Sequence, residues 1–225
     1  MKNMTRIIGH RGAAGLALEN SPESIKAALT QNIDAVECDV QRTLDGKLVV
    51  IHGKTTGRVA QANVRIADKT LAQLQTIPLK NGQRIPTLDQ ALSMLGSMPV
   101  IIDIKDEGSA DELLAILAKH PHAQVSFASF KHGELARLAA ARPDAPIYVL
   151  EHFSPIDIIR HAHSMQARGI GLNKWLMNPL TYYLAKHYGL ELFVYTLNSR
   201  LLAWFFLKLY PSVNICTDHP ERLRQ

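Results

Sequence analysis

The chain has 225 residues, of which 47% are hydrophobic and 20% are charged. This composition is typical of one folded domain with a sizeable core, and it excludes a disordered or repetitive chain. The formal net charge of +5 suits anionic partners, but no long run of Lys or Arg occurs, so we do not expect a nucleic-acid-binding protein.

The cysteines and the apolar runs bear on location. Cys38 and Cys216 are the only cysteines, and both fall in predicted strands. They do not make a disulfide framework, so we expect a reducing, cytoplasmic compartment. The N-terminus has no signal-peptide pattern. The longest apolar run, 201–207, is shorter than the ~20 residues that span a bilayer. It predicts a buried helix and no stable membrane insertion, with a weak interfacial role as the alternative. A homo-oligomer is compatible with the sequence.

The first unit along the chain is a strand, a loop and a helix. Residues 6–10 read as a short strand. Asn20 or Ser21 then caps a helix that has Pro22 at its first position and runs to about Gln31.

An acidic strand follows at residues 35–40. Its apolar members face one side, while Glu37 and Asp39 face the other. Taken alone, the stretch favours an edge strand whose polar face meets water. The alternative is an interior strand whose two carboxylates share a divalent metal ion.

A hairpin and an insertion come next. Asp45-Gly46 is a strong turn signal, so the strand at 48–52 returns antiparallel and brings His52 toward the level of Glu37. Residues 53–67 are irregular and polar, which indicates an inserted loop within a hairpin-and-insertion region of about 41–85. Short helices are expected at 70–74 and up to about Leu95, the second capped by Thr87.

From residue 100 the pattern is regular. We expect strands at 100–105, 124–128, 146–150, 169–173, 192–196 and 213–217. Helices are expected at 111–119, 132–141, 155–166, 179–188 and 200–209, with a last short helix from His219 or Pro220. With the first two units this makes eight strand–helix pairs, which predicts a single-domain α/β fold, a (β/α)8 TIM-type barrel over 1–225. An open doubly wound sheet is the rival, but residues 9–12 lack the form of its Gly-rich phosphate loop.

In such a barrel the active site lies at the carboxyl ends of the strands. The polar residues that fall there are His10, Arg11, Glu37, Asp39, His52, Asp103, Lys105, Tyr195, Thr196, Asn198, Thr217 and Asp218. Six other histidines fall in or near the outer helices, where a structural or exposed role is expected: His120, His122, His132, His161, His163 and His187.

The acidic members of this rim indicate a metal site. Glu37, Asp39 and Asp103 offer only oxygen ligands, which favour Mg²⁺ or Ca²⁺. A zinc ion would instead be expected to use His10 and His52.

The basic members indicate an anionic substrate. Arg11 and Lys105 suit a phosphate group, whose oxygens gather charge in the transition state. His10 and His52 suit acid–base catalysis, because one imidazole can be neutral while the other is protonated.

Together these residues resemble the glycerophosphodiester phosphodiesterase family. The matching segments, in order, are 9–12, 19–21, 36–40, 43–46, 49–52, 85–88, 102–105, 194–198 and 216–220. The resemblance implies a TIM-type barrel with a small insertion after the second strand. It also implies hydrolysis of small glycerophosphodiesters, the deacylated phospholipids, to sn-glycerol 3-phosphate and an alcohol.

The resemblance also implies roles. His10 and His52 match the catalytic pair, Glu37 and Asp39 the metal ligands, Arg11 and Lys105 the phosphate contacts, and Tyr195 the aromatic wall at the glycerol end. Glu19 and Asn20 match supporting residues, and Arg58 stands where the family often has an arginine that either contacts substrate or covers the rim.

Two positions depart from the family pattern. Asp103 stands where Glu is usual, and Gly53 stands where Asp usually follows the second histidine. Metal affinity is therefore the property most in question. Two alternatives stay open: a non-catalytic barrel that binds phospholipid head groups or a protein, and a phospholipase D-like lyase that forms a cyclic phosphate.

Overall fold

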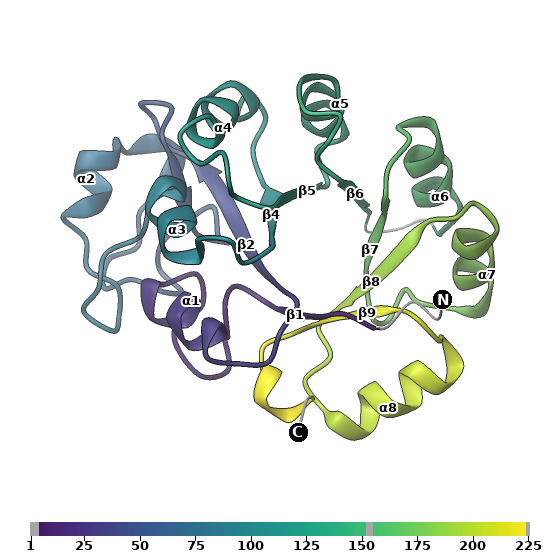
Figure 1. Ribbon diagram of the computed structural model, residues 1–225. Helices are drawn as coiled ribbons and strands as arrows, with labels where there is room; N and C mark the ends of the chain where they lie inside the picture. Colours follow the sequence, from purple (N-terminus) through teal and green to yellow (C-terminus); the bar gives the residue numbers. More distant parts are fainter. Residues whose placement is uncertain (1–4, 152–154, 224–225) are drawn as a thin grey trace.

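The computed structural model describes residues 5–151 and 155–223, which form a closed parallel barrel surrounded by helices (Figure 1). The barrel strands are β1 (Ile7–Gly9), β2 (Ala35–Arg42), β4 (Val100–Ile104), β5 (Val125–Ser129), β6 (Ile147–Leu150), β7 (Gly169–Asn173), β8 (Glu191–Tyr195) and β9 (Asn214–Thr217). Strand β1 pairs in parallel with both β2 and β9, and these two pairings close the ring. The predicted eight-stranded barrel is confirmed.

The remaining strand, β3 (Leu48–Val50), lies outside the ring. It pairs antiparallel with β2, with Val40 opposite Val50. The predicted hairpin therefore forms, and its return strand leads toward the barrel mouth.

The helices lie between consecutive strands and cover the outside of the ring. They are α1 (Pro22–Leu29), α2 (Leu71–Gln75), α3 (Leu88–Leu95), α4 (Ala110–Leu117), α5 (His132–Ala141), α6 (Pro155–Ser164), α7 (Pro179–His187) and α8 (Arg200–Leu209), with 3₁₀ turns η1 (Ile66–Asp68) and η2 (Pro220–Arg222). Helix α1 begins as predicted, because the Ser21 side chain accepts from the Ser24 amide and the Ser24 side chain bonds back. It ends at Leu29, two residues before the expected Gln31.

The alternation in β2 separates two environments. Cys38 packs in the outer core with α1 and α3 residues such as Ile25 and Leu88. Glu37 and Asp39 face the barrel interior, where Asp39 is only 1% exposed. The edge-strand interpretation of this stretch was therefore wrong, because β4 covers the open side of β2.

The inserted region builds a small core of its own, apart from the barrel. Its buried residues are Val49, Ile51, Val59, Ala60, Ile66, Leu74, Leu79 and Ile85. Isolated bridges join Thr55 to Arg65 and Ala60 to Leu79. The region that looked irregular is thus a compact lobe beside the β2–β3 hairpin (Figure 1).

Candidate active site

The barrel mouth contains a cavity with about 160 Å³ of space for the centres of water molecules. Its walls include all eight of the site residues predicted from the sequence: His10, Arg11, Glu37, Asp39, His52, Asp103, Lys105 and Tyr195. Residues from the two ends of the chain therefore meet in one place, because barrel closure sets β1 between β2 and β9.

A tight loop after β1 positions His10 and Arg11. Arg11 and Gly12 both have left-handed backbones, with φ of 53° and 86°. A Cβ at Gly12 would lie 2.6 Å from the Ser24 backbone, so only glycine fits. The turn aims the Arg11 amide at Glu37, whose Oε2 accepts a hydrogen bond from it at 2.9 Å.

Three carboxylates converge on the floor of the cavity. Asp39 and Asp103 lie opposite each other on β2 and β4, and Glu37 is two residues earlier on β2. One oxygen from each lies within 4.8 Å of the others. Asp103 Oδ1 is buried and has no hydrogen-bond partner among the described residues. An all-oxygen donor set with an unpaired buried oxygen fits Mg²⁺ or Ca²⁺ better than zinc.

Burial and mutual repulsion give the three carboxyl groups different pKa values. Burial, reinforced by Asp39, raises the pKa of Glu37 to about 7. Burial also raises the pKa of Asp103 to about 6, although Lys105 opposes it. Burial works in the same direction on Asp39, but Lys105 and Arg11 outweigh it and lower the pKa of Asp39 to about 2. The raised pKa values of Glu37 and Asp103 show that full ionisation of the cluster is unfavourable without a further positive charge, as expected of a cation site.

The two predicted phosphate-binding cations lie beside these acids. Lys105 Nζ is 2.7 Å from Asp39 Oδ1 and also pairs with Asp103. Arg11 Nε is 3.2 Å from Asp39 Oδ2, and its Nη1 is 3.0 Å from Glu19. Both cations are thus fixed at the cavity wall by carboxylates, in place to meet an anion that enters.

His10 is held by an acid from the far end of the chain. Its Nδ1 lies 2.6 Å from Asp218 Oδ1, and Asn198 donates to the other Asp218 oxygen at 2.7 Å. Burial by itself lowers the pKa of His10, but the hydrogen bond to Asp218 and the charge of Glu37 outweigh it and raise that pKa above its usual value. The bond to Asp218 leaves Nε2 as the ring nitrogen that carries the exchangeable proton.

His52 has the opposite surroundings. The Ile51 amide donates to the Asp39 carbonyl at 3.0 Å, and this pairing carries the chain from β3 to the cavity. Burial lowers the pKa of His52 to about 4; Asp39 opposes the shift, whereas Arg11, Lys105 and Arg58 add to it. The ring is therefore neutral at physiological pH, while the raised pKa of His10, which lines the same cavity, favours its protonated form.

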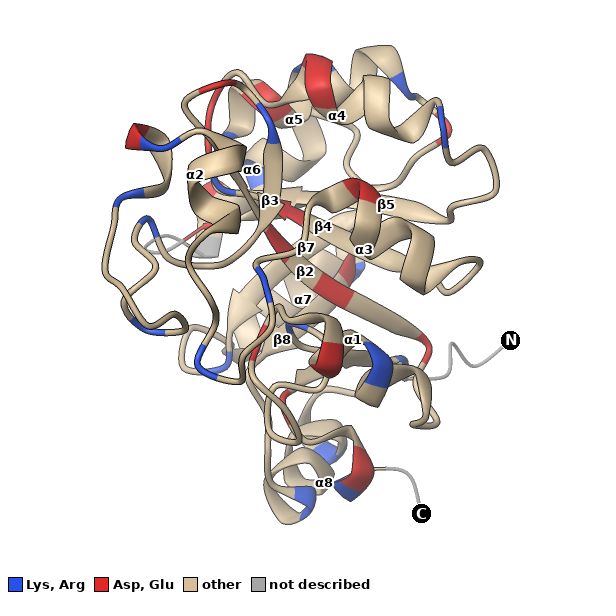
Figure 2. Cartoon of the chain, turned by 90° about the vertical axis from the view of Figure 1, so that its left-hand side faces the viewer, with Lys and Arg blue, Asp and Glu red and all other residues tan. Residues whose placement is uncertain are grey.

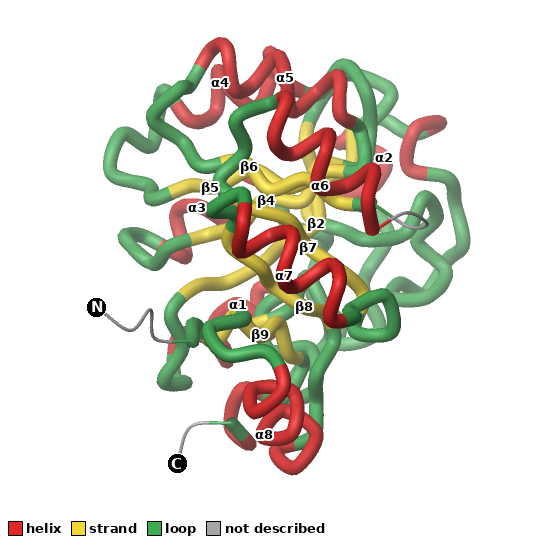
Figure 3. The backbone as a smooth tube through the Cα atoms, turned by 90° about the vertical axis from the view of Figure 1, so that its right-hand side faces the viewer, coloured by secondary structure: helices red, strands yellow, loops and turns green. Residues whose placement is uncertain are grey.

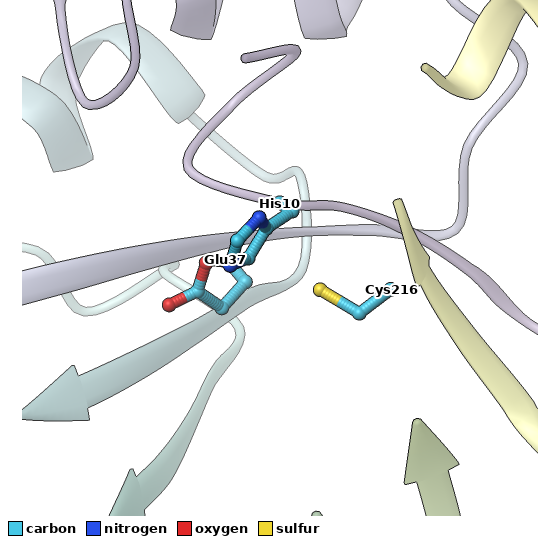
Figure 4. Close-up of side chains that lie close together, drawn as sticks. All are labelled: His10, Glu37 and Cys216. Carbon is cyan, nitrogen blue, oxygen red and sulfur yellow. Dashed lines mark ion pairs between the residues drawn. The ribbon is translucent and has the colours of Figure 1, made fainter. Parts of the chain in front are cut away.

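The third group that approaches His10 is a thiol (Figure 4). His10 Nε2 lies 4.0 Å from Glu37 Oε2, and the Cys216 side chain points toward both. One ligand atom from each of His10, Glu37 and Cys216 lies within 4.8 Å of the others, and burial raises the pKa of the Cys216 thiol well above its usual value, so the sulfur is protonated in the protein without metal.

Asp218 and Asn198 are site residues that the sequence placed on the rim without a role. Asn198 also accepts from the Asp218 amide at 2.9 Å and from Thr217 Oγ1 at 3.2 Å. The signal in the sequence that places them at the active-site rim is their position just after β8 and β9. The contact between Asp218 and His10, which are 208 residues apart, could not be predicted from the sequence.

The expected supporting residues make the contacts that such a role needs. Asn20 donates to Asp39 Oδ2 at 2.8 Å and accepts from the Asp39 amide at 3.3 Å. Glu19 bridges Arg11 and Arg58, so Arg58 is tied to the rim through an acid.

Gly53 is required by the loop after His52. A Cβ there would approach the Thr55 carbonyl oxygen to 2.8 Å. A larger residue at this position would therefore require the backbone of 53–55 to shift.

One wall of the cavity is mainly apolar. Phe130, Leu150 and Phe193 line it together with Tyr195. The six histidines assigned to the outer helices do not line the cavity; His120, for example, pairs with Asp89 at 2.9 Å, and His132 contacts His161 edge to face.

Comparisons with known proteins identify the family of the chain. Residues 10–222 match the model of the glycerophosphoryl diester phosphodiesterase family. A glycerophosphodiester phosphodiesterase of Caldanaerobacter subterraneus is 26% identical over 97% of this chain and 96% of its own. One of Bacillus subtilis is 28% identical over 88% of this chain and 80% of its own.

Solved structures with a similar fold include a phosphodiesterase. The structure of an Oleispira antarctica phosphodiesterase in complex with its product, sn-glycerol-3-phosphate, superimposes with a TM-score of 0.90 at 22% identity, covering 98% of this chain and 95% of its own. Since the family model spans nearly the whole chain, the protein belongs to the glycerophosphoryl diester phosphodiesterase family, enzymes that hydrolyse glycerophosphodiesters.

Proposed function

We propose that the protein hydrolyses glycerophosphodiesters to sn-glycerol 3-phosphate and an alcohol with the help of Mg²⁺ or Ca²⁺, using His10 and His52 as an acid–base pair. The observation that carries the proposal is the pair of imidazoles with oppositely shifted pKa values on one cavity. The product bound to the Oleispira relative supports the choice of substrate.

The two histidines divide the proton transfers. Neutral His52 accepts the proton of the attacking hydroxyl as its oxygen bonds to phosphorus, and protonated His10 gives its Nε2 proton to the departing alcohol oxygen as the phosphorus–oxygen bond breaks. Asp218 keeps His10 in the tautomer that presents Nε2 to the cavity.

Arg11 and Lys105 bind the phosphoryl oxygens, and Glu37, Asp39 and Asp103 would hold the cation. When bound, a divalent ion supplies positive charge to the phosphoryl oxygens as their charge builds up. Tyr195 and the apolar wall line the space for the two ester groups. A cytoplasmic location stays a prediction based on two buried free thiols.

The test uses glycerophosphocholine with Mg²⁺ or Ca²⁺ and identifies the product by phosphorus NMR. We expect glycerol 3-phosphate, no reaction after chelation, and losses of about 10²–10⁴ in kcat for His10→Ala and for His52→Ala. His122→Ala, a change at an exposed histidine, is the matched control and should keep wild-type turnover.

Three results would contradict the proposal. Wild-type turnover in both active-site variants would remove the acid–base assignment. A cyclic phosphate as the final product would make the protein a lyase. Binding of glycerophosphocholine without turnover in any divalent ion would make it a non-catalytic barrel.

A further inference from the structure

Helix α8 carries an apolar surface that the barrel does not cover, so the prediction that 201–207 forms a buried helix was wrong. Leu201, Trp204, Phe205 and Leu209 are between 52% and 68% exposed, whereas Ala203 on the opposite side packs into the core. We call these four exposed residues the α8 face. Their spacing of about one helical turn makes a continuous stripe. Contiguous exposed apolar surfaces of this kind mark binding sites.

The segment of the chain that contains the α8 face is basic in sequence. Between residues 169 and 217 the chain has four Lys and Arg residues and a single acid, Glu191. That acid already accepts hydrogen bonds from Tyr148 and Arg168. Helix α8 itself contains Arg200 and Lys208 and no acidic residue (Figure 2).

The basic and aromatic side chains of α8 are arranged together. The Lys208 ammonium lies 5.5 Å from the centre of the Trp204 ring. Its aliphatic stem therefore adds to the apolar stripe while the charge stays at its edge. The surface is both apolar and cationic over the whole helix.

The same character continues onto α7, the neighbouring helix (Figure 3). Tyr182 packs against Tyr210 just after α8 and donates to the Pro211 carbonyl at 2.8 Å. Next to it Tyr183 is exposed, and Lys186 lies over the Tyr182 ring. The two helices thus form one side of the molecule, rich in aromatic rings and basic groups.

We propose that this side docks on the surface of an anionic phospholipid bilayer, with α8 lying in the interface. Helices that bind interfaces combine Trp, Phe and Leu on one face with Lys and Arg. Aromatic rings suit the head-group level, and each basic group gains energy near acidic lipids. The proposal does not depend on the chemistry proposed above.

Docking in the interface is not spanning. Among residues 5–151 and 155–223 no helix has the length and apolar character to cross a bilayer. A single helix of ten residues gives reversible attachment that depends on lipid charge.

The charges also argue against a second copy of the chain as the occupant. Two α8 helices packed antiparallel would set the Arg200 end of one beside the Lys208 end of the other. Packed in parallel, like ends would meet. In either case no acid of α8 is available to neutralise the cations, so anionic lipid is the better match.

The first test is sedimentation with vesicles of phosphatidylcholine, with or without phosphatidylglycerol. We expect partitioning at least about tenfold stronger onto the acidic vesicles. Raising NaCl from about 0.05 M to about 0.5 M should release the protein, because screening shortens the reach of the charges. Equal binding to neutral and acidic vesicles, or none to either, would overturn the proposal.

The second test changes the α8 face. The double variant Trp204→Glu with Phe205→Glu should lose more than about tenfold of its partitioning, because it sets two carboxylates against acidic lipid. Leu44→Glu, at an equally exposed leucine (61%) in the β2–β3 turn, is the matched control and should bind as the wild type. Circular dichroism and melting temperature check that both variants fold. Unchanged binding of the folded double variant would refute the role of α8.

The third test reports the position of one ring. The chain has two tryptophans, so Trp175→Phe leaves Trp204 as the only one. On acidic vesicles its emission should shift to the blue, and brominated lipids should quench it. Binding without either change would place another surface on the lipid.

One further outcome would assign the α8 face to a second copy of the chain. In that case the wild type would not bind vesicles, and it would form a dimer in lipid-free buffer that Phe205→Glu dissociates.

Discussion

His10 and His52 line one cavity but differ in the charges around them. Asp218 and Glu37 raise the pKa of the buried His10 ring above its usual value. Burial and three nearby cationic groups lower the pKa of His52 to about 4. A neutral base and a protonated acid can therefore coexist at pH values between the two pKa values, which is what the proposed proton transfers need.

Asp218→Asn should shift the alkaline limb of the pH profile of kcat to lower pH. The reaction needs protonated His10, so activity falls as pH rises through the His10 pKa, and that pKa drops when the carboxylate is neutralised. The acid limb, set by neutral His52, should stay in place. Steady-state kinetics across pH measure both limbs, and KM should change little.

A purely structural role for Asp218 makes a different prediction. In that case Asp218→Asn would lower kcat equally at every pH and leave both limbs where they are. If the alkaline limb does not move, Asp218 is not the residue that positions His10 and raises its pKa.

The position of single residues at the barrel mouth could be predicted from the sequence, whereas their roles stay proposals. His10, Glu37 and Lys105 follow or lie on strands whose apolar pattern fixes where each strand ends. Their partners were harder to predict. The Asp218 contact depends on β9 closing the ring beside β1, and the Lys105 ion pairs depend on the register that sets Asp39 opposite Asp103. Neither pairing leaves a periodic trace in the sequence.

At the scale of elements, the loop from β1 to α1 connects fold to function. The Ser24 hydroxyl in the first turn of α1 donates to the Arg11 carbonyl at 2.9 Å. The Ala13 amide donates to the Ser24 carbonyl at 3.0 Å. The helix start and the loop that carries His10 and Arg11 are therefore one hydrogen-bonded unit, and Gly12 lies where they touch.

Gly12→Ala should destabilise the protein by more than about 3 kcal/mol, because its Cβ meets the α1 backbone at 2.6 Å in addition to the cost of a positive φ. Gly82→Ala is the matched control. Gly82 has a φ of 81° but nothing within 4 Å of the added Cβ, so only the conformational cost of about 1 kcal/mol is expected. Urea unfolding measures both, and equal losses would show that the contact with α1 is unimportant.

The inserted lobe shows why elements differ in predictability. The repeated strand–helix units could be placed because each has a strong period of apolar residues. The lobe is held by eight buried side chains at irregular intervals from Val49 to Ile85. Irregular spacing has no signature in a sequence, so only the lobe's boundaries were expected and its core was not.

At the scale of the whole molecule, the barrel concentrates charge that it does not fully neutralise. Glu37 has its pKa raised to about 7 by burial and by Asp39. An acid whose folded-state pKa is raised contributes stability that is complete below its unfolded value near 4.5 and is lost as pH rises through about 7. At pH 8 the ionised Glu37 carboxylate, crowded by Asp39, therefore lowers the free energy of unfolding of the metal-free protein, and a bound cation offsets this loss.

Glu37→Gln should consequently raise the melting temperature of the metal-free protein at pH 8, by roughly 2–4 °C for a gain on the order of 1 kcal/mol. Mg²⁺ or Ca²⁺ should raise the wild-type melting temperature, because a ligand of the native state stabilises it, and should do so much less in the variant.

Glu134→Gln is the matched control. This buried carboxylate accepts hydrogen bonds from the amides of Gly108, Ser109 and Ala110, so the amide substitution should destabilise the protein and leave the response to metal intact. Calorimetry at pH 8 with and without chelator separates the two buried acids. Two results together would contradict this prediction: a metal-free Glu37→Gln protein that is less stable than the wild type, and a response to the cation that is undiminished. They would mean that the carboxylates on the floor of the cavity do not form the metal site.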